Sequence, residues 1–146
     1  MLENNQEAIE SFQEAIRINP EFADAHSRLG LIFNELGRYQ ESIACFDKVL
    51  ETNPEDEDSW VNKGIALYSL HKYPEAIFCY DKVLEINPRN ATAWCYKGDR
   101  LENLEKYEEA IEAYKNSIKF ASPEFEKEVQ EVKKAIQNLE AKTRKS

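Results

Sequence analysis

Few residues in this chain are suited to catalysis, and their spacing does not gather them into a catalytic set. The chain has two histidines, His26 and His71, and no glycine-rich phosphate-binding loop. Asp99 and Glu102 lie one helical turn apart. That spacing suits an acid/base pair, but it is more typical of carboxylates that are simply solvated. The sequence therefore predicts a protein that is not an enzyme and that needs no cofactor.

The acidic and sulfur-containing residues do not indicate a metal site either. Four successive acids at residues 55–58 precede a predicted helix but lack the spaced loop of a calcium site. They suit the positive end of the helix dipole instead. The three cysteines, Cys45, Cys79 and Cys95, are odd in number and have no paired ligand spacing, which is typical of a reducing compartment. We expect Cys45 and Cys79 to be surface or edge packing residues, not a disulfide.

The distribution of charge argues against nucleic acid as a partner. The net charge is −9, and residues 1–122 carry 23 acidic against 13 basic residues. Affinity for nucleic acid depends on basic residues that neutralise phosphates. The first 20 residues hold five charges and no apolar run, so they do not resemble a secretory signal. No stretch approaches the roughly 18 apolar residues of a membrane span. We therefore expect a soluble, cytoplasmic protein with no membrane partner.

A period of 34 residues runs through most of the chain. In register along the sequence are Gly30, Gly64 and Gly98; Tyr39, Tyr73 and Tyr107; Ile43, Ile77 and Ile111; Phe46, Tyr80 and Tyr114; Asn53-Pro54 and Asn87-Pro88. Within each period the apolar residues recur at three- and four-residue spacing in two stretches, which predicts a pair of amphipathic helices. A fixed period of this length is the signature of a solenoid.

These marks closely resemble the tetratricopeptide repeat family. The marks that carry the resemblance are aromatic, glycine, small and proline positions: His26, Trp60 and Trp94; Gly30, Gly64 and Gly98; Ser42, Ala76 and Ala110; Pro54, Pro88 and Ser122. Three positions depart from the pattern, because His26 replaces an aromatic residue, Ser42 a small apolar one, and the third proline has moved to Pro123. The resemblance implies an all-α fold, a right-handed α-solenoid of antiparallel helix pairs with a C-terminal capping helix.

The repeat also predicts how the chain divides. We expect a half-repeat at 1–22, full units at 23–56, 57–90 and 91–122, and a capping helix with a basic tail at 123–146. The predicted helices of the full units are 23–36, 39–52, 57–70, 74–86, 91–104 and 107–120. In the last segment Phe125, Val129, Val132, Ile136 and Leu139 form one apolar stripe, and residues 141–146 are expected to fray. A glycine inside a helix costs about 1 kcal/mol relative to alanine, so the repeated glycines predict a close aromatic neighbour.

The N-terminal half-repeat supplies only the second helix of a unit. Its apolar residues are Ala8, Ile9, Phe12, Ala15 and Ile16. Terminal repeats normally present a polar outer face. We therefore advance the hypothesis that this end forms a homodimer or pairs with another chain.

The resemblance implies a peptide-binding groove lined by the first helix of each unit. The positions that face such a groove are Asp24, Ser27, Leu31, Asn34, Glu35, Asp58, Val61, Asn62, Ile65, Tyr68, Thr92, Cys95, Asp99 and Glu102. Most of the apolar members come from the first two units, and every charged member is acidic. The groove is therefore predicted to accept a protein or peptide with apolar anchors and neutral-to-basic flanks. The alternative is a solvated inner face that has no specific partner.

One subgroup of the family binds chaperone C-terminal carboxylates through lysine, arginine and asparagine side chains on the first helices. Only Asn62 matches that clamp here, because Ser27, Leu31, Thr92 and Tyr96 stand where the other clamp residues would be. Identity and charge therefore argue against a chaperone tail as the ligand.

Two further functions remain open from the sequence. The chain is either a non-enzymatic protein-interaction scaffold or an architectural module whose half-repeat drives homo-oligomerisation. Repeats of this family also occur beside catalytic domains such as glycosyltransferases, so the chain also suits a targeting fragment of a larger protein.

Overall fold

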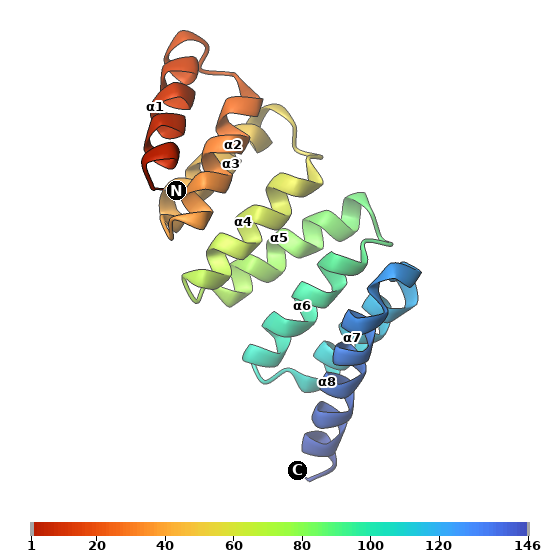
Figure 1. The fold of residues 1–146 in the computed structure, drawn as a ribbon. Helices are drawn as coiled ribbons and strands as arrows, with labels where there is room; N and C mark the ends of the chain where they lie inside the picture. The colour runs from red at the N-terminus through yellow and green to blue at the C-terminus, as the bar shows by residue number, and fades with distance from the viewer. Residues whose placement is uncertain (1, 146) are drawn as a thin grey trace. The chain divides into compact units, whose positions relative to one another are not determined.

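A computed structural model of the chain describes residues 2–145, and all its regular elements are helical (Figure 1). The helices in chain order are α1 (Leu2–Ile18), α2 (Ala23–Glu35), α3 (Tyr39–Thr52), α4 (Glu57–Ser69), α5 (Tyr73–Ile86), α6 (Ala91–Asn103), α7 (Tyr107–Phe120), the 3₁₀-helix η1 (Pro123–Phe125) and α8 (Glu126–Arg144). The six helices predicted for the full units are confirmed to within one residue at every end. None of the described helices is long and apolar enough to span a membrane.

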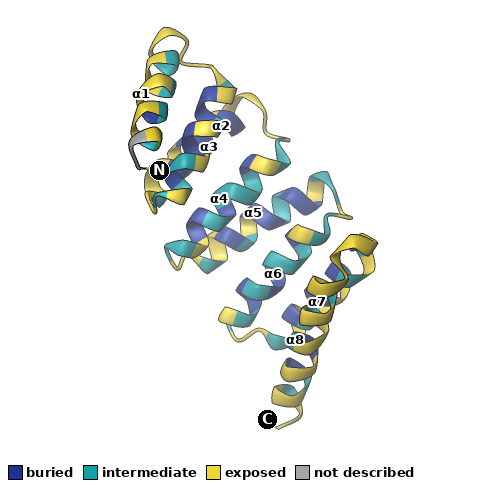
Figure 2. Cartoon of the chain, in the orientation of Figure 1, coloured by how far each residue is buried: buried dark blue, intermediate teal, exposed yellow. Residues whose placement is uncertain are grey.

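The helices form two compact units. Unit 1 ends at Lys72 and contains α1 to α4; unit 2 begins at Tyr73 and contains α5 to α8. In unit 1, α2 packs against α1 and α3, and α4 packs against α3 and also touches α2. In unit 2, α6 packs against α5 and α7, and α7 packs against α8. Consecutive helices thus bury one another's apolar stripes within each unit (Figure 2).

The repeated glycines mark the places where a helix pair packs most closely. A Cβ on Gly98 would lie 2.7 Å from the Tyr114 ring, and one on Gly30 would lie 2.9 Å from the Phe46 ring. Both distances are too short for a real Cβ, so only glycine allows α6 to pack on α7 and α2 on α3 at this separation. The predicted aromatic neighbour is confirmed at both glycines.

Two departures from the repeat pattern are explained by hydrogen bonds. Trp60 and Trp94 each donate from Nε1 to the carbonyl oxygen of the proline six residues before them, at 2.8 and 2.9 Å. His26 stands at the same position, and its Nε2 lies 2.9 Å from the carbonyl oxygen of Pro20. Ser42, which replaces an alanine, is fully buried and donates to the carbonyl oxygen of Gly30 at 2.9 Å. Each substitute therefore keeps its buried polar atom paired.

The tight turns between paired helices need one residue of positive φ. That residue is Gly37 at φ 71° between α2 and α3, and His71 and Glu105 at φ 58° at the equivalent positions. A left-handed residue commonly ends a helix, and glycine adopts it without steric cost. The histidine and the glutamate adopt it at some cost in free energy.

An ion pair recurs between the second helix of one repeat and the first helix of the next. Lys63 Nζ of α4 lies 2.5 Å from Asp47 Oδ1 of α3. Lys97 Nζ of α6 lies 2.6 Å from Asp81 Oδ1 of α5. Each lysine also lies 5.5 Å from the ring centroid of the tryptophan three residues before it. One such lysine-centred contact therefore joins two helices in each unit.

The structure corrects three expectations about packing. Cys45 and Cys79 are buried core residues, 7% and 1% exposed, and not surface or edge residues. Of the tail expected to fray, residues 141–144 are helical and continue α8, and Ser146 lies outside the described residues. Within the predicted apolar stripe, Ile136 and Leu139 are buried, but Phe125 lies in η1 and remains 49% exposed.

The apolar face of the N-terminal half-repeat is covered within the chain. Ile9 of α1 is 3% exposed and packs with Leu29 and Phe33 of α2, while Phe12 and Ile16 lie partly buried against the same cluster. Ala8 and Ala15 are half-buried. Packing on α2 therefore covers much of this face, and homodimerisation through the half-repeat stays a prediction.

Candidate functional site

The inner-face residues of unit 1 come together on α2 and α4. Asn34 of α2 donates from Nδ2 to the backbone oxygen of Asn62 in α4 at 3.3 Å. Asn62 in turn donates from its own Nδ2 to the backbone oxygen of Asp58 at 2.8 Å. The first bond links α2 to α4 on the predicted face, and the second lies within α4.

Apolar side chains on this face remain open to solvent. Leu31 is 43% exposed and Tyr68 is 36% exposed. Val61 and Ile65 are half-buried, as is Ser27. The apolar residues of this face on α2 and α4, which we call the unit 1 strip, are the exposed Leu31 and Tyr68 and the half-buried Val61 and Ile65. Such a strip offers anchoring contacts to a partner at the cost of exposed apolar area.

The acids around the unit 1 strip differ in their pairing. Asp24 accepts a hydrogen bond from Arg28 Nε at 3.2 Å across one helical turn. Glu35 and Asp58 are exposed, and within residues 2–145 neither forms an ion pair. The strip is thus bordered by two negative charges that remain available to a basic group.

In unit 2 the face residues of α6 form a hydrogen-bonded network. The Tyr114 hydroxyl of α7 lies 2.6 Å from Asp99 Oδ1 and 3.0 Å from Glu102 Oε2. Burial raises the pKa of Asp99, opposed by the hydrogen bond from Tyr114 and by the Arg100 charge. Burial and the two carboxylates raise the pKa of Tyr114, which keeps its proton and donates it between the acids. The predicted pair Asp99 and Glu102 is therefore joined through a tyrosine, while the Asp99 side chain stays 42% exposed and also contacts Arg100.

Sequence reasoning missed a buried arginine in this network. Arg100 is 5% exposed, its Nη1 lies 3.2 Å from Asp99 Oδ2, and its guanidinium lies 5.3 and 5.6 Å from the ring centroids of Tyr96 and Tyr80. The sequence does contain a signal for this arginine, because the equivalent positions of the other two repeats hold Ile32 and Ala66. A charged residue at a position that is apolar in the other repeats predicts a polar network in that repeat alone.

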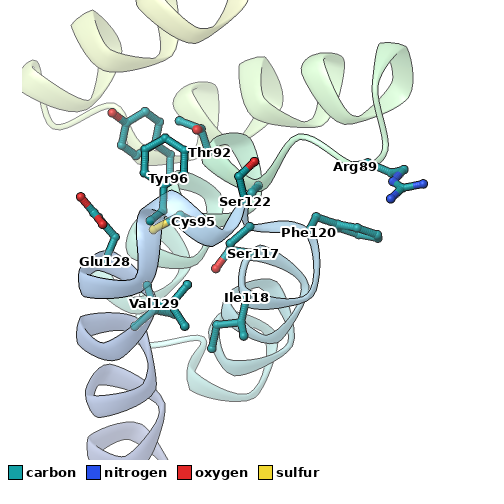
Figure 3. A pocket seen from close by; sticks show the side chains of 14 residues that line it. Arg89, Thr92, Cys95, Tyr96, Ser117, Ile118, Phe120, Ser122, Glu128 and Val129 are labelled. Carbon is teal, nitrogen blue, oxygen red and sulfur yellow. The ribbon is translucent and has the colours of Figure 1, made fainter.

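The remaining predicted site residues, Thr92 and Cys95, line a cavity of about 420 Å³ in unit 2 (Figure 3). The cavity lies where the start of α6, the end of α7 and the start of α8 meet. Its other walls include Tyr96 from α6, Ile118 from α7 and Val129 from α8. This volume lies within the range of ordinary ligand pockets. The repeat pattern could not indicate it, since α8 lies outside the repeats.

The cysteine in the cavity is not activated as a nucleophile. Burial, followed by the neighbouring Asp99 charge, raises the pKa of Cys95 to about 11. The thiolate is the reactive form of cysteine, and it is therefore scarce near neutral pH. Among residues 2–145, no group of three or more histidine, cysteine, aspartate and glutamate residues is placed to hold a metal ion.

Comparison with protein-family models places the chain in a known class of helical-repeat proteins. Models described as tetratricopeptide repeat match residues 23–56, 57–90 and 79–112, and one described as TPR repeat matches residues 2–37. Together they cover residues 2–112. The chain belongs to the tetratricopeptide repeat family, and the resemblance seen in the sequence is confirmed. The comparison with curated proteins finds no match.

Solved structures of similar fold agree with this assignment. A crystal structure of MamA aligns with a TM-score of 0.79 at 18% identity, over 97% of this chain and 80% of that one. The Yersinia enterocolitica type III secretion translocator chaperone SycD aligns with a TM-score of 0.78 at 15% identity, over 83% and 85% of the two chains. A second SycD structure, in complex with a peptide of the translocator YopD, has the same TM-score and identity. At such identities the likeness shows the fold alone, an all-α solenoid of the tetratricopeptide type.

Proposed function

We propose that this chain is a non-enzymatic, cytoplasmic interaction scaffold that binds a peptide segment of a partner protein along its first helices. The observation that carries the proposal is the unit 1 strip, where Leu31 and Tyr68 stay 43% and 36% exposed on the face that the repeat pattern assigns to binding. An exposed apolar strip with a polar border is typical of an interaction site.

The borders of the strip define the chemistry of the partner. Glu35 and Asp58 are exposed and make no ion pair with any described residue. A bound lysine or arginine would gain an ion pair with either acid, while an acidic flank would be repelled. The partner is therefore a peptide with apolar anchors and neutral-to-basic flanks. The face positions Asp24, Ser27, Asn34 and Asn62 supply polar contacts beside these anchors.

The fold is compatible with this role. SycD, of the same fold, has been crystallised with a peptide of the translocator YopD. That complex belongs to SycD, and its relevance here is that a solenoid of this kind has a surface able to hold a peptide.

A selection from random dodecapeptides displayed on phage tests the proposal. We expect peptides rich in large apolar and basic residues, and we expect Leu31→Ala and Tyr68→Ala each to weaken the best peptide about fivefold or more. Phe78→Ala is the matched control, because Phe78 is 55% exposed on α5 and lies outside the predicted face. Failure to enrich any peptide, or equal losses for the control, would refute the proposal.

The alternative function, an architectural module that forms homo-oligomers, is tested by the oligomeric state of the chain. Ile18 and Phe22, at the end of α1 and the start of α2, are 73% and 43% exposed. Sedimentation over a concentration series would reveal a dimer, and substitution of Ile18 by glutamate would dissociate it if this edge makes the contact. A targeting role within a larger protein is compatible with either outcome.

A further inference from the structure

The cavity of unit 2 is a distinct candidate, because it depends on a helix that is not part of any repeat. Three residues of α8 and η1, Phe125, Val129 and Val132, form one wall. Phe125 is 49% exposed although it belongs to the apolar stripe of this segment. An apolar wall that the chain itself leaves half open is available to the side chain of a partner.

Two opposite charges stand at the sides of this cavity. Arg89 and Glu128 both line it, and Figure 3 shows them on opposite sides, with Arg89 beside Phe120. The Arg89 guanidinium lies 5.7 Å from the Phe120 ring centroid. Within residues 2–145, neither Arg89 nor Glu128 forms an ion pair. The cavity therefore has an apolar centre, one available positive charge and one available negative charge.

We propose that this cavity receives a bulky apolar side chain of a peptide partner, with an acidic residue on the Arg89 side and a basic residue on the Glu128 side. The inference rests on the proposed function, and it adds a second anchor point with its own charge pattern. A neutral apolar ligand would leave Arg89 and Glu128 without an ion-pair partner. A second copy of this acidic chain would be repelled by Glu128. The volume of about 420 Å³ is ample for such a side chain.

The experiment uses the full chain and the same phage-displayed dodecapeptide library. One selection is made on the unmodified protein and one on the double variant Arg89→Glu, Glu128→Lys. Besides the basic peptides that bind the unit 1 strip, we expect the first selection to enrich a second group, with a large apolar residue between an acid and a base. The second selection should enrich the same apolar residue with the two charges exchanged. For a purified peptide, Arg89→Glu and Glu128→Lys should each weaken binding about tenfold, and the charge-exchanged peptide should restore it to the double variant.

Matched controls separate the local effect from a change in net charge. Lys133 and Glu131 are exposed residues of α8 that do not line the cavity. The double variant Lys133→Glu, Glu131→Lys should select the same peptides as the unmodified protein. Phe125→Ala should weaken binding about tenfold, whereas Phe78→Ala should leave it unchanged.

The outcomes distinguish this inference from the proposed function. Peptides that lose affinity on Leu31→Ala and Tyr68→Ala, but not on charge reversal at the cavity, would overturn the inference alone. Peptides that lose affinity for the cavity variants, but not for Leu31→Ala or Tyr68→Ala, would support the inference. They would refute the placement of the main binding site on the unit 1 strip. A dimer of this chain that dissociates on Phe125→Ala would assign the cavity to a second copy and overturn the peptide proposal.

Discussion

The first helices of the three full repeats, α2 and α4 in unit 1 and α6 in unit 2, share their packing residues. They differ in the side chains on the predicted binding face. At one repeat position α2 and α4 carry Leu31 and Ile65, where α6 carries Asp99. Three residues further on, Tyr68 of α4 corresponds to Glu102 of α6. Unit 1 therefore offers an apolar strip to solvent, while unit 2 ties its acids into a network with Tyr114. The repeat fixes the helix contacts and leaves the face residues free to diverge.

The shared core should be the most sensitive part of both units. Tyr114 and Phe46 are each 2% exposed and occupy the same repeat position. Tyr114→Ala and Phe46→Ala should each lower the free energy of unfolding by about 3–5 kcal/mol, because each leaves a large cavity. Urea unfolding followed by circular dichroism measures this. Phe78→Ala, at a 55% exposed position, should change stability by less than about 0.5 kcal/mol. A loss below about 1 kcal/mol at both core sites would contradict the packing.

Substitution of the repeated glycines should change the free energy of unfolding by a smaller amount, and the change should differ between unit 1 and unit 2. Gly98→Ala should lower the free energy of unfolding by about 2 kcal/mol, since the new Cβ would lie 2.7 Å from the Tyr114 ring. Gly30→Ala should cost less, because its nearest ring atoms are at 2.9 Å. Alanine gains about 1 kcal/mol of helix propensity at both sites, so the difference between the variants is the informative quantity. Stabilisation by Gly98→Ala would refute the close contact.

The network of unit 2 should make the cost of losing the Tyr114 hydroxyl depend on pH. Tyr114→Phe should cost about 1 kcal/mol at neutral pH, through the lost hydroxyl. In the folded protein, burial raises the pKa of Asp99 and the Tyr114 hydrogen bond lowers it, so removing the hydroxyl raises that pKa further.

The sign of this effect follows from proton binding. A carboxyl whose pKa is raised on folding holds its proton more tightly in the native state, so stability falls as pH rises through that range. The cost of Tyr114→Phe should therefore grow as the pH rises above the ordinary titration range of an aspartate, about pH 4. Unfolding curves of both proteins at several pH values test it, and Phe78→Ala, at a 55% exposed position, is the control. A cost that shrinks with rising pH would contradict the network.

The smallest effects should come from the repeated ion pairs, and they should be alike in both units. Asp47 and Asp81 have side chains 46% and 44% exposed, and their lysine partners are 21% and 23% exposed. Asp47→Asn and Asp81→Asn should each cost about 0.5 kcal/mol at low salt, and less in high salt. Unequal costs in unfolding experiments would show that the two contacts are not equivalent.

The fold was predictable because the 34-residue period encodes pairs of contacts. Gly98 and Tyr114 are each marked by the period, and their contact explains why both types recur. The end of α8 was not predictable from the same logic, since residues 141–144 carry no apolar stripe. Basic residues in the last turn suit the negative end of a helix dipole, and Lys142 Nζ lies 5.3 Å from the Tyr107 ring centroid. Those contacts extend the helix to Arg144.

For the candidate site, the family pattern predicts a set of positions but not how their side chains are arranged. The family pattern identifies Asp99 and Glu102 as face residues, yet only the packing of α7 shows that Tyr114 lies between them. The cavity with Thr92 and Cys95 was also missed, because its walls from α8 depend on how a segment outside the period packs. Periodicity specifies which side chains share a face, and tertiary packing decides which of them stay open.

The most direct test of the central claim compares peptide selection on the unmodified chain with selection on the double variant Leu31→Ser, Tyr68→Ser. Both residues are exposed, so the variant should fold as the unmodified protein does. We predict that the unmodified chain enriches peptides with apolar anchors and basic flanks, and that the variant loses at least about tenfold in affinity for them. Equal affinity of the two proteins for the selected peptides would contradict the claim that the unit 1 strip is the binding surface.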